Sequence, residues 1–198
     1  YSGAITVLGA ATPIITYNIK VTDSGTTIKG SDPTTTDGTN ISTLNIVETN
    51  AGASGDPTGS NRSTKIAIKT GANGADWSDD PTNYVLFKFK VACGKKLTPS
   101  KIHIPVANVG SASANNIKYK AVMSDYFGHT LTGTYVVTTG NGTVENFDIN
   151  NADASKYFQG EVTLKLWAWT IASKDNGGSA FRMGTPVTIY GEIANQAT

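Results

Sequence analysis

Two indole rings and an ammonium group lie close together in the run Val162–Thr170. The run alternates as a strand does, and successive side chains of a strand point to opposite faces. One face is aliphatic, and the other carries Thr163, Lys165, Trp167 and Trp169. A half-buried strand turns its aliphatic row to the core, which would leave the two indoles in water. We therefore predict that Trp167 and Trp169 form an exposed platform on which sugar rings stack, with Lys165 beside it; the alternative is a second buried layer.

A second alternating run, Tyr84–Val91, carries lysines on its outward row. Its apolar row predicts a buried face, and its outward row consists of Tyr84, Leu86, Lys88 and Lys90. Further lysines take outward positions in the candidate strands 101–106 and 116–123. Solvation and protection against edge-to-edge aggregation account for any single lysine. If several of these rows lie in one sheet, they form a basic face beside the tryptophans that suits an acidic polysaccharide.

Arg182 and Trp77 are further candidates for ligand contacts. Arg182 follows a polar loop, and its guanidinium presents a planar fork of donors that grips a carboxylate or two adjacent hydroxyls. A structural ion pair with Asp175 or Glu192 would explain Arg182 equally well. Trp77 lies in the loop 74–81 and either lines the edge of a binding surface or covers the end of the core. The predicted ligand-binding residues are Trp167, Trp169, Lys165, Arg182, Lys88, Lys90, Trp77 and Tyr84.

Signals of catalysis are weak by comparison. The sequence has two histidines, His103 and His129, and neither lies in a metal-binding or triad motif. It has no Gly-x-Ser-x-Gly elbow, no His-Glu-x-x-His motif and no phosphate-cradling glycine motif. A glycosidase needs two acidic residues on one inward face, and the pattern places no such pair. A polysaccharide lyase groups Tyr, His, Arg and Gln on its strands, and no candidate strand has that grouping. We predict a protein that is not an enzyme and needs no cofactor.

The Asp-rich segment Asp76–Asp80 is the one candidate for metal binding. Its carboxylates are hard oxygen ligands of the kind that calcium prefers, but their spacing is not that of a defined calcium loop. A solvated turn is the main interpretation, and a structural calcium ion is the alternative.

Composition indicates one all-β domain. The 198 residues include 21 glycines and abundant Thr, Ser and Asn, and only 16% are charged, which suits strands joined by polar turns. A net charge of +1 excludes a nucleic-acid-binding polycation. No run reaches the ~18 apolar residues of a membrane helix, so we expect no membrane partner. Cys93 is the single cysteine, which excludes an internal disulfide and a cysteine-rich zinc site.

Candidate strands recur between turns at intervals typical of a β-sandwich. They are Ala4–Leu8, Ile14–Val21, Leu44–Val47, Lys65–Lys69, Asn83–Ala92, Lys101–Val106, Asn116–Met123, Gly133–Thr138, Val144–Asp148, Val162–Thr170 and Pro186–Ile193. Residues 23–62 are rich in turn-forming residues and are interpreted as long surface loops of the same domain. Asp153–Tyr157 is the one candidate helical turn. The predicted fold is an all-β, antiparallel, jelly-roll-like β-sandwich of two packed sheets with long polar loops, in one domain of residues 1–198.

A series of short motifs runs from Asp76 to the end of the chain. It consists of Trp77, the run Asn83–Phe89, the segment Gly94–Ile102, the triplet Phe181-Arg182-Met183 and the closing run Val187–Ile193. This series resembles the β-sandwich modules that are attached to pectate lyases and other polysaccharide-degrading enzymes of bacteria. The resemblance implies a secreted carbohydrate-binding module, with pectin-like homogalacturonan as its ligand and a catalytic domain attached in the parent chain.

The residues and the resemblance together predict a non-catalytic carbohydrate-binding module that binds plant cell-wall polysaccharide outside a bacterial cell. The lysines favour pectin, whereas a neutral β-glycan such as xylan or glucan fits the tryptophans equally well. A structural or adhesive extracellular β-sandwich is the first alternative, and a polysaccharide lyase or hydrolase is the second. Because no basic-then-apolar leader opens the sequence, we expect a mature or excised domain.

Overall fold

The computed structural model of the chain describes residues 12–21, 28–35, 38–49, 53–54, 63–66, 79, 81, 84–107, 117–137, 143–170, 179–182 and 186–196. Within these ranges every regular element is a β-strand, and no helix that could span a membrane is present. The strands are β1 (Pro13–Val21), β2 (Ile28–Thr35), β3 (Ile41–Thr49), β4 (Ala53–Ser54), β5 (Ser63–Ile66), β6 (Tyr84–Val91), β7 (Lys95–Ala107), β8 (Ile117–Asp125), β9 (Thr130–Val137), β10 (Val144–Asn150), β11 (Glu161–Thr170), β12 (Ser179–Arg182) and β13 (Val187–Asn195).

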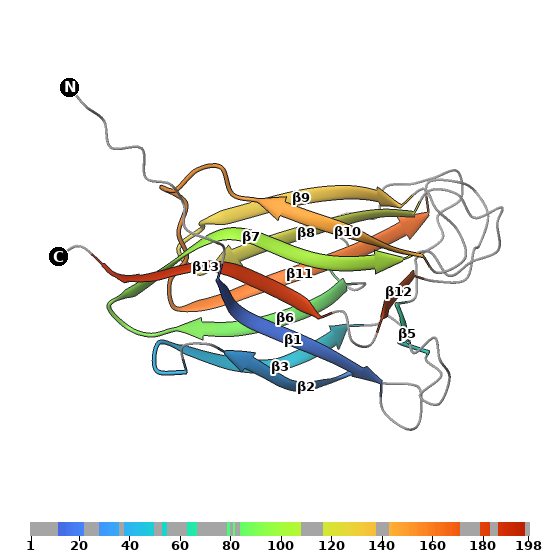
Figure 1. The fold of residues 1–198 in the computed structure, drawn as a ribbon, viewed down its shortest axis with the longest axis horizontal. Coiled ribbons are helices and arrows are strands. Elements are labelled where there is room, and N and C mark those ends of the chain that lie inside the picture. Colours follow the sequence, from blue (N-terminus) through green and yellow to red (C-terminus); the bar gives the residue numbers. More distant parts are fainter. Residues whose placement is uncertain are drawn as a thin grey trace.

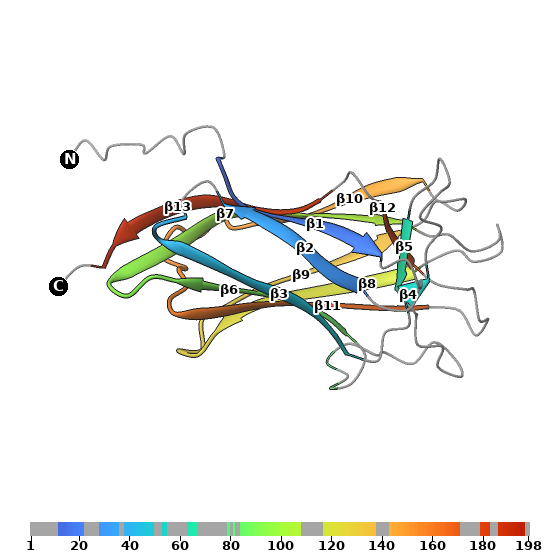
Figure 2. The same cartoon turned by 90° about the horizontal axis from the view of Figure 1, so that it is seen from below.

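Two five-stranded antiparallel sheets form the body of the molecule (Figure 1). The β7 sheet has the strand order β10-β7-β13-β1-β2, and the β11 sheet has the order β3-β6-β11-β8-β9. Seen from below, the two sheets are separate layers, and the small sheet β12-β5-β4 lies at one end of them (Figure 2). The predicted all-β, antiparallel sandwich of two sheets is confirmed.

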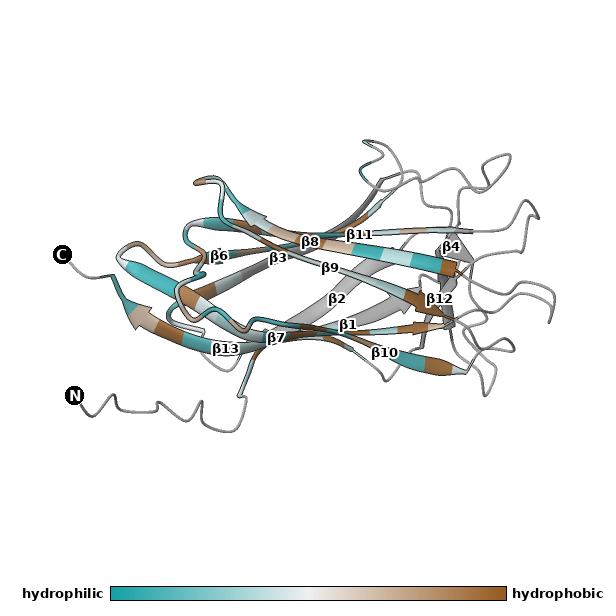
Figure 3. Cartoon of the chain, turned by 90° about the horizontal axis from the view of Figure 1, so that it is seen from above, coloured by the Kyte–Doolittle hydropathy of each residue, from teal (hydrophilic) through white to brown (hydrophobic). Residues whose placement is uncertain are grey.

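The core lies between the two sheets and consists of the inward rows that alternation predicts. In β6 the inward residues Val85, Phe87, Phe89 and Val91 are fully buried. The aliphatic row of β11 is buried beside them, and Phe147 of β10 closes on the core from the other sheet. Apolar and polar residues consequently alternate along the strands (Figure 3). Burial of these rows drives the two sheets together, because apolar surface removed from water stabilises the fold by about 25 cal/mol per Å².

Two buried tyrosines link the sheets by hydrogen bonds. The Tyr17 hydroxyl of β1 donates to the carbonyl oxygen of Lys88 in β6 at 2.7 Å. The Tyr119 hydroxyl of β8 donates to the carbonyl oxygen of Ala107 in β7 at 3.0 Å. Each bond satisfies a hydroxyl that would be costly to bury without a partner.

The segment 151–160 closes one end of the sandwich. Phe158 is fully buried, and its backbone exchanges two hydrogen bonds with Leu97 of β7, at 2.8 and 2.9 Å. The buried Asn151 side chain donates to the carbonyl oxygen of Pro99 at 2.9 Å. The candidate helical turn is instead a tight turn, in which the Lys156 N–H donates to the Asp153 carbonyl oxygen at 3.0 Å. We call this end, which also contains the β8–β9 turn, the turn end.

Three strands, β2, β4 and β12, were not expected from the sequence. β2 and β4 lie within residues 23–62, which are predicted to form surface loops, and β2 includes the turn-forming residues Asp32 and Pro33. β2 tolerates a proline because it is an edge strand, and its pairing with β1 is irregular at this point, between Thr16 and Asn18. β12 includes Arg182, and within the described part of the chain it pairs with β5. The candidate strand Ala4–Leu8 lies outside the described residues.

Candidate functional site

The lysine rows of three strands meet on the outer face of the β11 sheet, the face turned away from the β7 sheet. Trp167 pairs with Lys120 and Trp169 with Lys118, both on β8, and Thr163 pairs with Lys88 on β6. Directly paired residues project to the same face. The strand pairing therefore places Lys88, Lys90, Lys118, Lys120 and Lys165 on one face with the tryptophans. The rows of Lys101 and His103 belong to the β7 sheet instead.

Both tryptophans are buried, so the predicted exposure of the platform is wrong. Trp167 is 6% exposed and Trp169 is 2% exposed. The Tyr84 ring lies against Trp167, with ring centroids 5.8 Å apart. The Lys118 ammonium lies over the Trp169 ring, 5.4 Å from its centroid. Lysine stems cover aromatic faces in this way because the stem is apolar and the ammonium is attracted to the ring. The structure thus matches the alternative of a second buried layer.

Three further lysines of this face also have partners, whereas Lys90 is exposed. The Lys165 ammonium lies over the Tyr84 ring at 4.7 Å. Lys88 forms an ion pair with Glu161 at 3.3 Å, and Lys120 forms one with Asp79 at 2.7 Å. Exposed pairs of this kind contribute only about 0–1 kcal/mol each to the stability of the fold. Their main effect is to neutralise part of the positive charge of this face.

The other two predicted contacts, Arg182 and Trp77, have side chains outside the described part of the structure. Arg182 lies in β12, where it pairs with Ser63 of the small sheet, and its side chain is outside the described part of the structure. Trp77 also lies outside the described residues, as does most of the Asp76–Asp80 segment. The roles of Arg182 and Trp77 and the calcium alternative therefore stay predictions.

Among the described residues, the most exposed aromatic side chains lie in the β8–β9 turn, which the sequence analysis does not predict as a site. Tyr126 is 91% exposed and Phe127 is 62% exposed. They are followed by Gly128, whose φ of 87° is in the left-handed region that glycine adopts readily. An Asp-aromatic-aromatic-Gly sequence between two alternating runs is the signal that could have identified this turn.

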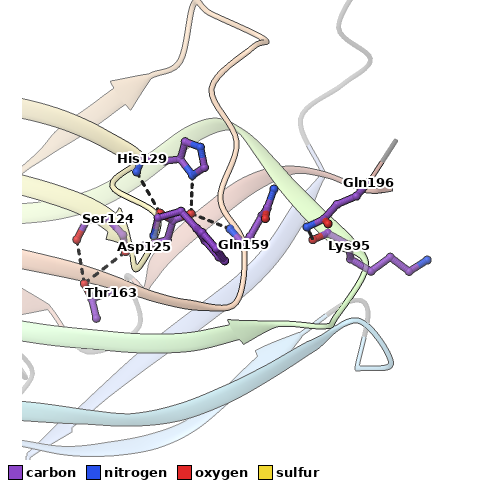
Figure 4. A network of polar contacts seen from close by, with 8 residues as sticks. Lys95, Ser124, Asp125, His129, Gln159, Thr163 and Gln196 are labelled. Carbon is purple, nitrogen blue, oxygen red and sulfur yellow. Dashed lines mark hydrogen bonds and ion pairs between the residues drawn. The ribbon is translucent and has the colours of Figure 1, made fainter. Parts of the chain in front are cut away.

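The turn is held by the carboxylate of Asp125 (Figure 4). Oδ1 accepts hydrogen bonds from the N–H groups of Phe127 at 2.9 Å and His129 at 3.0 Å. Oδ2 accepts from His129 Nδ1 at 2.8 Å and from the Gln159 N–H at 2.9 Å. The Asp125 side chain is completely buried by these partners. The same carboxylate therefore fixes the turn internally and fastens it to the segment 151–160.

The pKa of Asp125 lies below the ordinary value for an aspartate. Burial alone raises this pKa, because it disfavours the charged carboxylate. The hydrogen bonds from the His129 side chain and from the backbone of Gln159 and His129, together with the charge of the imidazole, outweigh that effect. Asp125 is consequently ionised at neutral pH.

An open pocket adjoins the turn on the outer face of the β11 sheet. Its volume is about 430 Å³, and its lining residues are Ser124, Asp125, Tyr126, Glu161 and Thr163. The Ser124 and Thr163 hydroxyls lie 3.2 Å apart on neighbouring strands. An aromatic ring beside two hydroxyls and a carboxylate suits a ligand that has both an apolar face and many hydroxyl groups.

The described residues contain no group of three or more His, Cys, Asp or Glu side chains that could hold a metal ion. Each histidine instead faces one carboxylate through Nδ1. His103 lies 2.6 Å from Asp148, and His129 lies 2.8 Å from Asp125. Such a pair fixes the orientation of the imidazole ring.

No family model and no curated protein matches the sequence. Among solved structures, the chain is similar to a xylan-binding module, CBM15, with 13% identity, 94% of this chain and 100% of that chain covered, and a TM-score of 0.38. It is also similar to TmCBM61, solved in complex with β-1,4-galactotriose, with 11% identity and a TM-score of 0.29. That match covers 79% of this chain and 87% of TmCBM61. Likenesses of this size do not assign a family or a ligand. The strands and their pairing define the chain as an all-β protein of the two-sheet sandwich class.

Proposed function

We propose that this chain is a non-catalytic carbohydrate-binding module whose ligand lies at the turn end of the outer face of the β11 sheet. The observation that supports this function best is the Tyr126 ring, which is 91% exposed at the edge of the open pocket. A sugar ring would stack its C–H face on Tyr126. Its hydroxyls would bond to Ser124, Thr163 and Glu161 in the pocket.

The expected affinity is modest. Stacking on one aromatic ring contributes about 0.5–1.5 kcal/mol beyond burial, and exposed polar contacts contribute less. We expect dissociation constants of about micromolar or weaker. The buried tryptophans have a supporting role in this proposal, because they form the layer beneath the lysines.

An acidic polysaccharide such as homogalacturonan is the proposed ligand class. Lys90 is exposed on the same face, and Lys88 lies across the sheet from Thr163 of the pocket. Neutral xylan and mixed-linkage glucan are the competing ligands. The resemblance of residues 76–198 to modules of polysaccharide-degrading bacteria supports the wider proposal of a secreted module that holds an attached enzyme near its substrate.

Affinity electrophoresis of the chain tests this function. The gels contain polygalacturonate, methyl-esterified pectin, xylan, mixed-linkage glucan or no polysaccharide, at low and high salt. We expect retardation by polygalacturonate that weakens with salt, because exposed charges are screened. Retardation by a neutral glycan alone would overturn the acidic ligand. Migration unchanged in every gel would overturn the function and favour a structural or adhesive module.

Tyr126→Ala tests the site within the same gels. We expect about a 2- to 10-fold loss of affinity, which is the contribution of one stacked ring. Tyr190→Ala is the matched control, since Tyr190 lies on β13 in the other sheet. Equal retardation of the two variants would place the ligand elsewhere on the molecule.

A further inference from the structure

A continuous series of rings leads from Tyr126 around the turn end. The Phe127 ring centroid lies 5.9 Å from that of Tyr126 and 6.4 Å from that of His129. The His129 ring lies 4.6 Å from Tyr157, and the Lys96 ammonium lies over the Tyr157 ring at 5.4 Å. The rings come from the β8–β9 turn and the segment 151–160, and the ammonium comes from β7, so distant parts of the sequence build one surface.

The fold holds these rings in place before any ligand binds. Asp125 fixes the turn that carries Phe127 and His129 through its four hydrogen bonds. Tyr157 is next to Phe158, which is locked to Leu97 by two backbone hydrogen bonds. A rigid surface loses little conformational entropy when a ligand binds, so the complex is more stable than one formed by a flexible surface. Phe127 nevertheless remains 62% exposed, and large apolar side chains that stay exposed side by side are often functional.

The charges at this end favour an anionic ligand. Lys96 lies over Tyr157, and Lys156 is exposed on the same segment. The Asp125 carboxylate is completely buried and faces its four donors rather than the solvent. The Asp153 carboxylate accepts a hydrogen bond from Ser155 and lies within electrostatic reach of Lys156. The Lys96 ammonium is therefore the charge that lies directly over the Tyr157 ring.

We propose that Phe127, Tyr157 and Lys96 form a second sugar subsite, which takes a uronate unit of the glycan whose neighbouring part lies on Tyr126. This inference rests on the proposed function for the class of ligand. The uronate ring packs against the Phe127 and Tyr157 rings, and its carboxylate pairs with the Lys96 ammonium. The glycan thus bends from the outer face of the β11 sheet onto the turn end.

Calorimetric titration with galacturonate oligomers of increasing length tests the second subsite. For long oligomers, we expect Tyr157→Ala to weaken binding about 2- to 10-fold and Lys96→Gln about 2- to 5-fold. Neither change should affect the shortest oligomer that binds, which occupies the Tyr126 subsite alone. Lys96→Gln should also leave the binding of neutral xylan oligomers unchanged.

The matched controls are Tyr190→Ala and Lys101→Gln. Lys101 lies over the Tyr190 ring at 4.8 Å on the β7 sheet, so these residues repeat the Lys96–Tyr157 contact at a distant place. If the unsubstituted chain binds neither galacturonate nor xylan oligomers, the proposed function itself is overturned; if it binds xylan oligomers alone, the acidic ligand and the second subsite are overturned. If it binds and the Lys96 and Tyr157 variants match their controls, the function stands and the second subsite is overturned. Should Tyr157→Ala fail to fold, as judged by its melting curve, Lys96→Gln decides the question alone.

Discussion

At the scale of single residues, Asp125 determines the geometry of the candidate site. It is a fully buried carboxylate that accepts four hydrogen bonds from two parts of the chain. Hydrogen bonds to an ionised group contribute about 1.5–3 kcal/mol, roughly twice the contribution of a neutral pair. One buried charge therefore sets the position of the exposed rings of Tyr126 and Phe127.

Asp125→Asn should destabilise the protein by about 1–3 kcal/mol at pH 7, because an amide presents a donor where the carboxylate accepts. The pKa of Asp125 is lowered in the folded state. Its contribution is therefore fully present above the pKa of about 3.9 that an unfolded aspartate has, and is lost as the pH falls through the folded value. Urea unfolding of both proteins from pH 7 to pH 3 should show the difference shrinking below about pH 4. A difference that stays constant over this range would contradict the role of the charge.

For the two tryptophans, the sequence predicts the face of the sheet on which they lie but not their exposure. Alternation correctly places Trp167 and Trp169 opposite the core, because it depends only on the geometry of one strand. Their exposure depends on Tyr84 and Lys118, which come from two other strands. The sequence does not state which strands are neighbours, so it could not predict that these side chains cover the indoles. Alternation does not identify Tyr126 either, since a turn residue belongs to no alternating pattern.

At the scale of elements, β7 has a bulge opposite Gly191 of β13. The register between β13 and β7 shifts between Tyr190 and Gly191, and β7 skips Ser100 at this point. A Cβ on Gly191 would stand 2.8 Å from the Pro99 Cα and closer still to the Thr98 carbonyl oxygen. The two backbones approach each other so closely that only glycine fits.

Gly191→Ala should therefore cost about 1–3 kcal/mol, because either strand must move to admit the methyl group. Thermal unfolding measured by circular dichroism checks this value. Gly38→Ala is the control, since a Cβ at Gly38 meets only the Thr35 hydroxyl, at an ordinary 3.6 Å. Equal melting temperatures for the two variants would show that the bulge is not constrained.

Strands with clear alternation were predictable as elements, and irregular strands were not. The sequence predicts the strand Tyr84–Val91 almost at its observed bounds, because four inward apolar residues form a regular alternating row. β2 lacks such a pattern and contains Pro33, so turn chemistry was the better local interpretation. Pairing with β1 overrides that local preference, which is a tertiary effect that a single sequence does not display.

At the scale of the whole molecule, two tyrosines join the sheets by direct hydrogen bonds. Tyr17 and Tyr119 each donate from one sheet to a backbone carbonyl of the other. Burial raises the pKa of Tyr17 far above the ordinary value for a tyrosine, so its hydroxyl keeps the proton that it donates. These hydrogen bonds are directional and fix how the two sheets lie on each other, whereas the apolar contacts of the core are non-directional.

Tyr17→Phe should lower the free energy of unfolding by about 1–3 kcal/mol, since the buried Lys88 carbonyl loses its side-chain donor. Urea denaturation gives this quantity directly. Tyr135→Phe is a suitable control, because its hydroxyl bonds to Glu145 in a partly buried position. A loss no larger than that of the control would mean that water or a backbone shift satisfies the carbonyl.

The strand order of the β7 sheet also dictates when the protein can complete its folding during synthesis. β13 lies between β7 and β1, although it is the last described strand of the chain and β1 is the first. Every strand of the β11 sheet precedes residue 171, so that sheet can pair while the ribosome is still working. The β7 sheet has a gap at its centre until residues 187–195 have emerged, which leaves one backbone edge of β1 and one of β7 unpaired in the nascent chain. Insertion of β13 between β7 and β1 is therefore the step that completes the β7 sheet and closes the core.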